Sequence, residues 1–401
     1  MPLGTLPVKH FNSEQPGAPV LSGTAGSLIA LLDACLLNGF NVLTPQSASA
    51  SGGVVTLTYA SAHGHGVDQI LKIAGSAGGV IDGEARITSV TSTTLSFAAP
   101  GVPDGPIAGS ITTRMAPAGW EKPFSGTNKA AYRSVAPDST RFFLRVDDSG
   151  SFNVSGQNQS WTNQPRIAAV FGAESMTDID TWSGQFPNAS QSGKFWTKST
   201  ANDGTARRWR LFADDRFLMF FCYKRTDIGY ASGFRFGDIV PFRPGDAYHA
   251  VINGGWDHAT FFVNSTFGSE QYESRFPYLS GDTTGAFLCR ASSQIGDPVA
   301  SAAFGSRLQD QSGVGGLTFP NPADNGLLLH APILVSEPGG SARGTWPGLY
   351  QPLHGDPFTT ETKVSNVPGL PGRTLQAVWL SRNSSSFNRA TVFIDITGPW
   401  R

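Results

Sequence analysis

Two histidines near the start of the chain have a spacing that metal ligands can use. His63 and His65 lie two residues apart, so on a strand both imidazoles would share one face and could bind one metal ion. Each is followed by a glycine, and no third ligand is close in sequence, whereas a metal site needs three or four converging ligands. We therefore expect a turn here rather than a metal site.

A second group of residues has the types needed for acid–base chemistry. His249 and the run Trp256-Asp257-His258 could together supply a carboxylate and an imidazole. The alternative is a turn between strands at 247–253 and 259–264, because Asn253-Gly254-Gly255 is a strong turn signal. We favour the turn.

Three pairs of carboxylates could serve a glycosidase, which needs two such groups about 5–10 Å apart across a cleft. The pairs are Asp147 with Asp148, Asp178 with Asp180, and Asp214 with Asp215. The side chains that could stack on sugars are Trp182, Trp196 and Trp209. Acidic residues beside strands are also ordinary turn residues, and we favour that interpretation, including for a calcium site at 178–180.

Established catalytic motifs are missing from the sequence. It contains no G-x-S-x-G elbow, Walker A loop, G-x-G-x-x-G, H-E-x-x-H or EF-hand loop. The sequence therefore predicts no catalytic, cofactor-binding or metal-binding residues, no cofactor and no enzymatic activity.

Composition and net charge exclude one further class of function, the binding of nucleic acids. The chain has 401 residues with 47 Gly, 27 Pro and 27 Phe, and its net charge is −1. Nucleic-acid binding needs a basic surplus, so we expect none. The densest basic cluster is Arg207, Arg208 and Arg210, which we interpret as a solvated or interface-facing strand rather than a phosphate site.

The three cysteines are far apart in the sequence. Cys35, Cys222 and Cys289 each lie in an apolar run and show no C-x-x-C spacing. We therefore expect neither a zinc site nor a disulfide framework. We expect buried free thiols in a reducing compartment instead.

The elements that would position these residues are mainly strands. Residues 1–22 contain four prolines and predict an extended arm, followed by one helix that Ser22 or Thr24 could cap and Gly39 would end. Residues 1–43 thus form an arm and helix. Residues 44–116 predict a small β-barrel or sandwich domain, with strands listed by residue range as 54–60, 69–75, 84–90, 94–100 and 109–115.

Residues 117–401 predict a larger body like a β-sandwich. A linker at 117–134 leads into it, and Asp214-Asp215 marks a hairpin. Its predicted strands are 140–148, 165–172, 207–214, 216–224, 247–253, 259–264, 286–291, 326–335, 374–381 and 390–396, with loops at 293–325 and 336–373.

Phenylalanines occur in adjacent or close positions within these strands: Phe142, Phe143, Phe217, Phe220, Phe221, Phe261 and Phe262. Neighbouring residues of a strand point to opposite faces, so these strands must be buried on both faces. We favour core packing, with an intersubunit interface as the alternative.

The N-terminal sequence does not resemble a signal peptide, and the longest apolar stretch, 27–40, is too short to span a bilayer. We expect a protein that is not exported and has no membrane partner.

Four stretches of the chain resemble structural proteins of tailed bacteriophages that infect proteobacteria. They are Trp120–Ser134 (WEKPFSGTNKAAYRS), Ala18–Phe40, Leu144–Asp148 with Glu174–Asp180, and Pro347–Tyr350 with Phe393–Arg401. The resemblance implies a virion component, assembled in the host bacterial cytoplasm, whose partners are its own copies and other virion proteins. It brings no catalytic residues.

The leading expectation is a homo-oligomeric protein docked at the tail, neck or baseplate, with the arm gripping a neighbour. One alternative is a capsid decoration protein or head spike. Another is a virion module that binds or cleaves a host surface glycan, using Asp147, Asp180 and exposed tryptophans.

Overall fold

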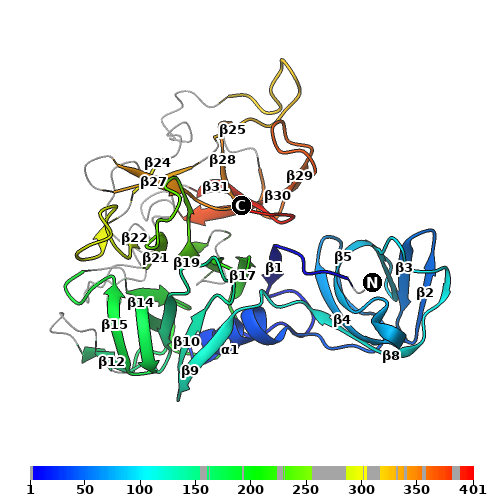
Figure 1. Ribbon diagram of the computed structural model, residues 1–401, viewed down its shortest axis with the longest axis horizontal. Helices are drawn as coiled ribbons and strands as arrows, with labels where there is room; N and C mark the ends of the chain where they lie inside the picture. The colour runs from blue at the N-terminus through cyan, green and yellow to red at the C-terminus, as the bar shows by residue number, and fades with distance from the viewer. Residues whose placement is uncertain are drawn as a thin grey trace.

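The computed structural model describes residues 3–153, 160–161, 163–191, 194–223, 229, 231–254, 286–300, 302–304, 317–330, 333–337, 341–354, 358–381 and 389–401. Within these residues the chain is mainly β, as predicted, with antiparallel sheets and one α-helix. Figure 1 shows a small domain at one side of a larger body. No helix among these residues is long and apolar enough to cross a membrane.

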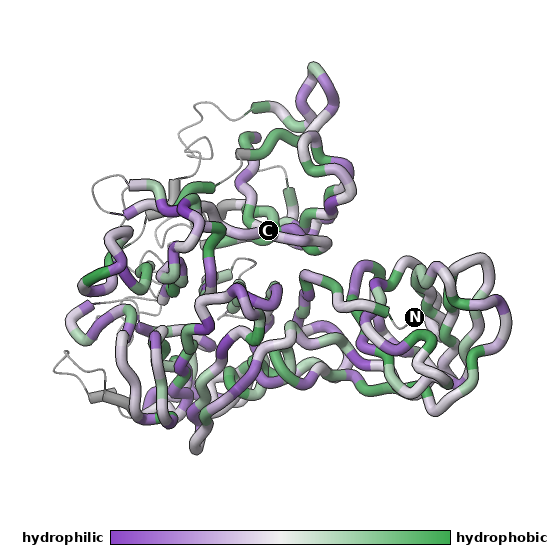
Figure 2. The backbone as a smooth tube through the Cα atoms, in the orientation of Figure 1, coloured by the Kyte–Doolittle hydropathy of each residue, from purple (hydrophilic) through white to green (hydrophobic). Residues whose placement is uncertain are grey.

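The small domain is a curled seven-stranded sheet with the order β7-β2-β3-β6-β5-β4-β8. Its strands are β2 (Ser47–Ser51), β3 (Val54–Thr58), β4 (Ile70–Ser76), β5 (Gly83–Val90), β6 (Thr94–Ala98), β7 (Gly105–Pro106) and β8 (Gly109–Met115). The five predicted strands are confirmed. Side chains alternate between the concave core and solvent, and Val55 and Leu57 of β3 are fully buried. Figure 2 shows the same short-range alternation of hydrophobic and hydrophilic residues along the tube.

The helix begins later than predicted. α1 (Ser27–Leu32) follows Gly26, which adopts a φ of 80°, and no side chain of the N-cap residue bonds the first turn. Caps at Ser22 or Thr24 are therefore wrong. The carboxylate of Asp148 takes this role from a distant part of the chain, since its Oδ2 accepts the Leu28 N–H at 2.8 Å.

The end of the helical region is as predicted. α1 continues into a π-helical segment, η1 (Asp33–Asn38), and stops at Gly39. Gly39 has a φ of 71°, and a Cβ there would lie 2.1 Å from the Met115 carbonyl oxygen. Only glycine permits both this left-handed conformation and this close approach.

The N-terminal arm is extended but is not free. β1 (Lys9–Asn12) pairs with β17 (Arg208–Ala213), with Phe11 opposite Leu211. Val8, Phe11 and Leu21 are buried in the cores of their own chain. The arm therefore forms the edge of a body sheet of its own chain.

The predicted linker at 117–134 is wrong, because it forms a hairpin of β9 (Glu121–Gly126) and β10 (Lys129–Arg133). This hairpin belongs to a six-stranded sheet with the order β15-β14-β11-β10-β9, in which β16 also pairs with β14. The other strands are β11 (Phe143–Asp147), β14 (Ile167–Asp178), β15 (Thr181–Phe186) and β16 (Phe195–Thr197). A separate short pair joins β12 (Phe152–Asn153) to β13 (Ser160–Trp161).

A second seven-stranded sheet forms the middle layer of the body, with the order β1-β17-β18-β19-β21-β22-β23. The strands not yet named are β18 (Phe217–Tyr223), β19 (Ser232–Asp238), β21 (Ala250–Asn253), β22 (Ala286–Leu288) and β23 (Val299–Ala300). The predicted hairpin at Asp214-Asp215 joins β17 to β18, with the Asp214 N–H donating to the Phe217 carbonyl at 3.0 Å.

The phenylalanines on this sheet fill cores on both faces. Phe220 and Phe234 pack on Trp196 of the six-stranded sheet, whereas Phe217 packs on Trp346 and Trp400 on the other side. The prediction that these strands are buried on both faces is confirmed, and core packing accounts for it. The predicted strand 259–264 lies outside the described residues.

Two smaller sheets cover the second face. One has the order β20-β27-β26-β24, and the other has the order β25-β28-β31-β30-β29. Their strands are β20 (Val240–Pro241), β24 (Ala302–Phe304), β25 (Leu329–His330), β26 (Leu334–Ser336), β27 (Ala342–Thr345), β28 (Leu349–Pro352), β29 (Lys363–Ser365), β30 (Thr374–Ser381) and β31 (Arg389–Asp395). Several of these short strands lie where loops are predicted, so the loop prediction for 293–325 and 336–373 is only partly right.

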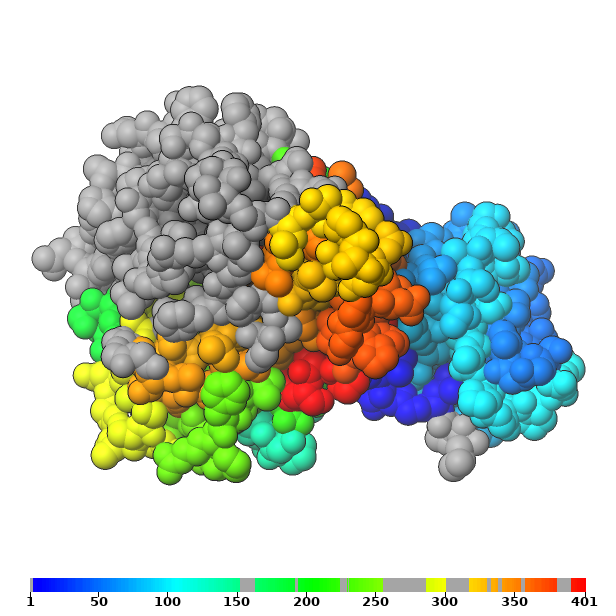
Figure 3. All heavy atoms as spheres, turned by 90° about the horizontal axis from the view of Figure 1, so that it is seen from above, coloured from blue at the N-terminus to red at the C-terminus, as the bar shows by residue number. Residues whose placement is uncertain are grey.

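Polar contacts join the small domain to the body. Arg86 donates to the carbonyl oxygens of Ile396 and Thr397 at 3.0 and 3.1 Å, and Lys363 pairs with Asp68 at 2.7 Å. In Figure 3 the N-terminal and C-terminal segments, blue and red, lie at the boundary between the two parts. The chain ends thus help to hold the small domain against the body.

Candidate functional site

A cleft of about 980 Å³ opens at one end of the body, where the six-stranded sheet meets the loop after β19. Its wall includes Glu174 of β14, Ser183 of β15 and the residues 239–241 and 245–249. The last residue of the chain, Arg401, also lines it. The cleft is therefore built from segments that are far apart in the sequence.

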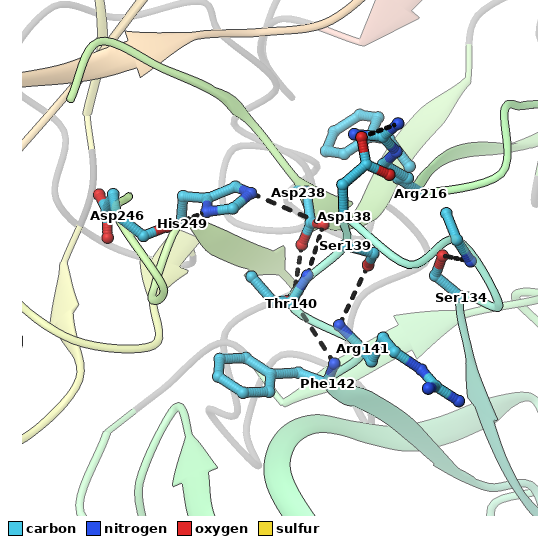
Figure 4. A network of polar contacts seen from close by, with 12 residues as sticks. Ser134, Asp138, Ser139, Thr140, Arg141, Phe142, Arg216, Asp238, Asp246 and His249 are labelled. Atoms are coloured by element: carbon cyan, nitrogen blue, oxygen red, sulfur yellow. Dashed lines mark hydrogen bonds and ion pairs between the residues drawn. The ribbon is translucent and has the colours of Figure 1, made fainter. Parts of the chain in front are cut away.

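Asp238, at the end of β19, organises one side of the cleft. It is buried, and its two carboxylate oxygens accept the N–H of Thr140 at 2.9 Å and the hydroxyl of Thr140 at 2.6 Å. The Nε2 atom of His249 lies 3.7 Å from Asp238 Oδ2, which makes an ion pair when the imidazole is protonated. Figure 4 shows these three side chains meeting, with His249 also bonded through Nδ1 to the carbonyl of Asp246.

Arginine–carboxylate pairs hold the walls in place. Arg343 bonds Asp246 at 2.7 Å and Glu337 at 2.9 Å, and all three side chains are buried. Arg290 bonds both oxygens of Glu174 at 2.6 Å, with its guanidinium 4.3 Å from the ring centre of Tyr248. Such two-point contacts fix geometry more firmly than single contacts.

The rim carries further pairs. Arg216 bonds Asp138 at 2.6 Å, as Figure 4 also shows, and Arg401 bonds Asp214 at 3.1 Å. Arg401 in addition donates to the Asp238 carbonyl at 3.2 Å. Each carboxylate described in the cleft therefore has a partner.

This arrangement suits binding of a polar ligand better than nucleophilic catalysis. The Thr140 hydroxyl donates to Asp238 and not to His249, so the order of contacts in a hydroxyl–imidazole–carboxylate relay is not present. The rings of Phe142 and Tyr248, with centres 5.9 Å apart, give the cleft an aromatic patch among its charged groups.

The structure brings His63 and His65 together but occupies their nitrogens. The ring centres are 5.5 Å apart, His63 Nε2 donates to the Thr94 carbonyl, and His65 Nε2 accepts from the Asn41 amide. No group of three possible metal ligands occurs in the part of the chain that the structure describes. His249 belongs to the cleft, whereas Trp256-Asp257-His258 lies outside the described residues.

Two of the carboxylates considered for a glycosidase, Asp147 and Asp180, meet around a cation. Arg145 Nη2 lies 2.8 Å from Asp180 Oδ1 and 3.7 Å from Asp147 Oδ2, and its guanidinium is 5.0 Å from the Trp182 ring centre. Hydrogen bonds from Lys129 and Arg145 lower the pKa of Asp180. An acid catalyst needs the opposite shift.

The remaining candidates serve the fold. Asp148 is fully buried against Lys198, Asp214 binds Arg401, and Asp178 accepts the N–H of Asp180 at 2.8 Å in a turn. Trp196 and Trp209 are buried and cannot stack on a sugar.

The basic cluster at 207–210 forms contacts within the chain, and the three cysteines are buried. Arg208 and Arg210 bond Glu14 and Glu361, and Arg207 donates to the Ser199 hydroxyl at 2.9 Å. These arginines link the arm and the C-terminal region rather than forming an open phosphate site. All three cysteines are free and buried, as predicted.

The sequence did not reveal the cleft as a site. Of its lining residues only His249 was considered for acid–base chemistry, because the others lie in turns and strands that are far apart in the sequence. A scan against protein-family models finds no match, and a search of curated proteins finds no similar sequence.

Proposed function

We propose that this chain is a structural component of a tailed-bacteriophage particle, docked at the tail, neck or baseplate. The observation that carries the proposal is where the phage-like stretches lie in the fold. The helical stretch contacts the 120–134 hairpin through Asp33, which accepts from Lys122 at 2.6 Å and from the Tyr132 hydroxyl at 2.8 Å. It contacts the third stretch through Asp148 and Leu28.

The fourth stretch lies at the junction with the small domain, where Arg86 binds the carbonyls of Ile396 and Thr397. The resemblance is thus concentrated in segments that pack on one another or hold the two parts together. A likeness in the framework supports a shared structural role more than a shared reaction.

The layered fold also suits a structural part. The middle sheet is packed on both faces, and the buried ion pair of Arg343 with Asp246 fixes the segment between β20 and β21 to β27. The phenylalanine side chains on both faces of the middle sheet are buried in the cores of this chain. Contacts with partner proteins must therefore use other surfaces. Apolar side chains that remain exposed include Phe242 and Ile295, at 54% and 73%.

Quantitative mass spectrometry of purified phage particles tests this proposal. A copy number equal to a small multiple of the tail symmetry would support docking at the tail, neck or baseplate. A copy number matching the capsid lattice would move the protein to capsid decoration. Absence from particles would refute the structural role.

A glycan-binding virion module is the second candidate, and the cleft with Phe142 and Tyr248 favours it. Calorimetric titration with host surface polysaccharide tests this function. A Ser183→Trp substitution would fill the cleft, whereas Ser89→Trp places the same ring on an exposed strand of the small domain. Binding that is lost only in the first variant supports the candidate, and equal binding by both variants contradicts it.

A further inference from the structure

Lys198 and Asp148 form the most completely buried ion pair among the described residues. Lys198 follows β16, Asp148 follows β11, and the accessible area of both side chains is zero. The amine Nζ contacts the carboxylate oxygen Oδ1 directly. An isolated pair of charges in such a site loses more solvation than a surface pair.

The surroundings fix both reacting groups. Lys198 Nζ also donates to the Thr24 carbonyl at 2.7 Å and lies 3.2 Å from the Ser27 hydroxyl oxygen. The second carboxylate oxygen, Oδ2 of Asp148, accepts the backbone N–H of Leu28 at 2.8 Å. The amine and the carboxyl group therefore cannot rotate away from each other without losing these bonds.

Burial shifts both groups toward their neutral forms. Desolvation raises the pKa of Asp148 to about 6, against the opposing effect of Lys198. Desolvation likewise lowers the pKa of Lys198. A neutral amine is a nucleophile and a neutral carboxylic acid is an electrophile, whereas the ammonium and carboxylate forms are neither.

We propose that Lys198 and Asp148 join in an intramolecular isopeptide bond once the chain has folded. Nζ attacks the carboxyl carbon of Asp148, a C–N bond forms, and the C–Oδ1 bond breaks. Before the attack, one ammonium proton passes from Nζ to Oδ1 of the carboxylate, which makes both groups neutral. Of the two protons left on the amine, one stays on the amide nitrogen and the other leaves with the Oδ1–H group as water. The positive and negative charges cancel, so the reaction needs no oxidant, reductant or other reagent.

The fold supplies the assistance that such a reaction needs. The Leu28 N–H points at Oδ2, where negative charge develops as Nζ adds to the carbon. The contacts to Thr24 and Ser27 hold the amine beside its target, which replaces a chance encounter by a fixed approach. Exclusion of solvent then protects the amide from hydrolysis.

The bond would have a clear mechanical role. It would close a loop of 50 residues between the ends of β11 and β16, and this loop contains β14 and β15. Those strands form the outer part of the six-stranded sheet that supports one wall of the cleft. This inference does not depend on the proposed virion function.

Another lysine–carboxylate pair in the same chain provides an internal control. Lys9 lies 2.9 Å from Glu84, but both side chains keep some solvent contact, with 4% and 5% exposed. We expect this pair to remain ionic, because even limited hydration favours the charged forms.

The test is mass spectrometry of the full-length protein purified in its folded state and then fully denatured. The expected intact mass is lower than that of the encoded chain by one water molecule. Trypsin should release a branched peptide in which residues 146–166 are joined to residues 195–207 through Lys198 and Asp148. No such branch should connect Lys9 to Glu84.

Two variants sharpen the result. Lys198→Arg should show no loss of water, and Asp148→Asn should lose ammonia instead of water because the same attack expels the amide nitrogen. An unmodified mass together with separate peptides from the wild-type protein would overturn the proposal, whether or not the variants fold. A loss of water without the branched peptide would overturn it as well.

Discussion

Mild acid should destabilise the junction between the arm and the small domain, through His10 and His65. His10 is buried, and its Nε2–H donates to the Asp68 carbonyl at 3.1 Å. Desolvation, followed by the positive charges of Lys363 and Arg86 and opposed by Asp68, lowers its pKa from 6.5 to about 4. Desolvation and then His63 lower the pKa of His65 to about 4.

The sign of the effect follows from these shifts. Between about pH 4 and 6.5 the unfolded chain binds a proton on each histidine that the folded chain does not bind. The free energy of unfolding therefore falls as the pH falls through this window. From neutral pH to about pH 5, each histidine should contribute a loss of about 2 kcal/mol, or about 4 kcal/mol together if they act independently.

Urea unfolding, followed by tryptophan fluorescence at neutral pH and at about pH 5, measures this loss. His10→Gln keeps a donor for the Asp68 carbonyl but removes one titrating group, so the loss between the two pH values should be smaller by about 2 kcal/mol in the variant. The raised pKa of Asp148 acts in the opposite direction in the wild-type protein and in the variant alike, so the difference between the two proteins isolates His10. A loss of the same size in both proteins would refute the reasoning.

Three further predictions test the packing. Phe11→Ala should lower the free energy of unfolding by about 3–5 kcal/mol, because the ring is buried beside Phe40. As a control, Val20→Ala should change this free energy by less than about 0.5 kcal/mol, because the Val20 side chain is 61% exposed. Urea unfolding checks both, and equal stability of the two variants would mean that the arm is not part of the core. Gly172→Ala should lower the free energy of unfolding by about 1–3 kcal/mol, because a Cβ there would lie 2.2 Å from the ring of Phe186. Gly204→Ala is the control, because the space around Gly204 is open, and thermal unfolding compares the two variants. A thiol reagent should label none of the three buried cysteines, Cys35, Cys222 and Cys289, in the folded protein and all of them in urea. Rapid labelling of the native protein would contradict their burial.

The strands that sequence patterns predicted are those with strong local signals. In β18, the run FLMFFCY has apolar side chains on both faces, and the turn at Asp214-Asp215 precedes it. Patterns of this kind depend on neighbours in the sequence, so they can be recognised without knowing the fold.

The strands that the sequence patterns did not predict are stabilised by their position in a sheet rather than by a local sequence signal. β9 lies within the segment predicted as a linker and contains Pro123. It is the edge strand of its sheet, where a missing N–H is tolerated. β2, with the sequence SASAS, has little intrinsic preference for a strand and is held by β3 on one side and β7 on the other. β19, which was assigned no element from the sequence, contains Gly233 and Gly237, and glycine is depleted in strands.

The cleft and the Lys198–Asp148 pair could not be predicted for a different reason. Their residues come from separate strands and loops, and only the tertiary fold brings them together. The cap of α1 shows the same limit. Nearby Ser22 and Thr24 looked suitable, but the carboxylate that accepts from the helix lies 120 residues away from Leu28.

The central claim is that this chain is built into a phage particle as a structural part. Cryo-electron microscopy of the purified particle tests it most directly, because the asymmetric outline of a small curled domain beside a layered body can be fitted to density (Figure 1). The account predicts density for this shape at a ring on the tail, neck or baseplate. A particle map with no density that fits the chain would contradict it.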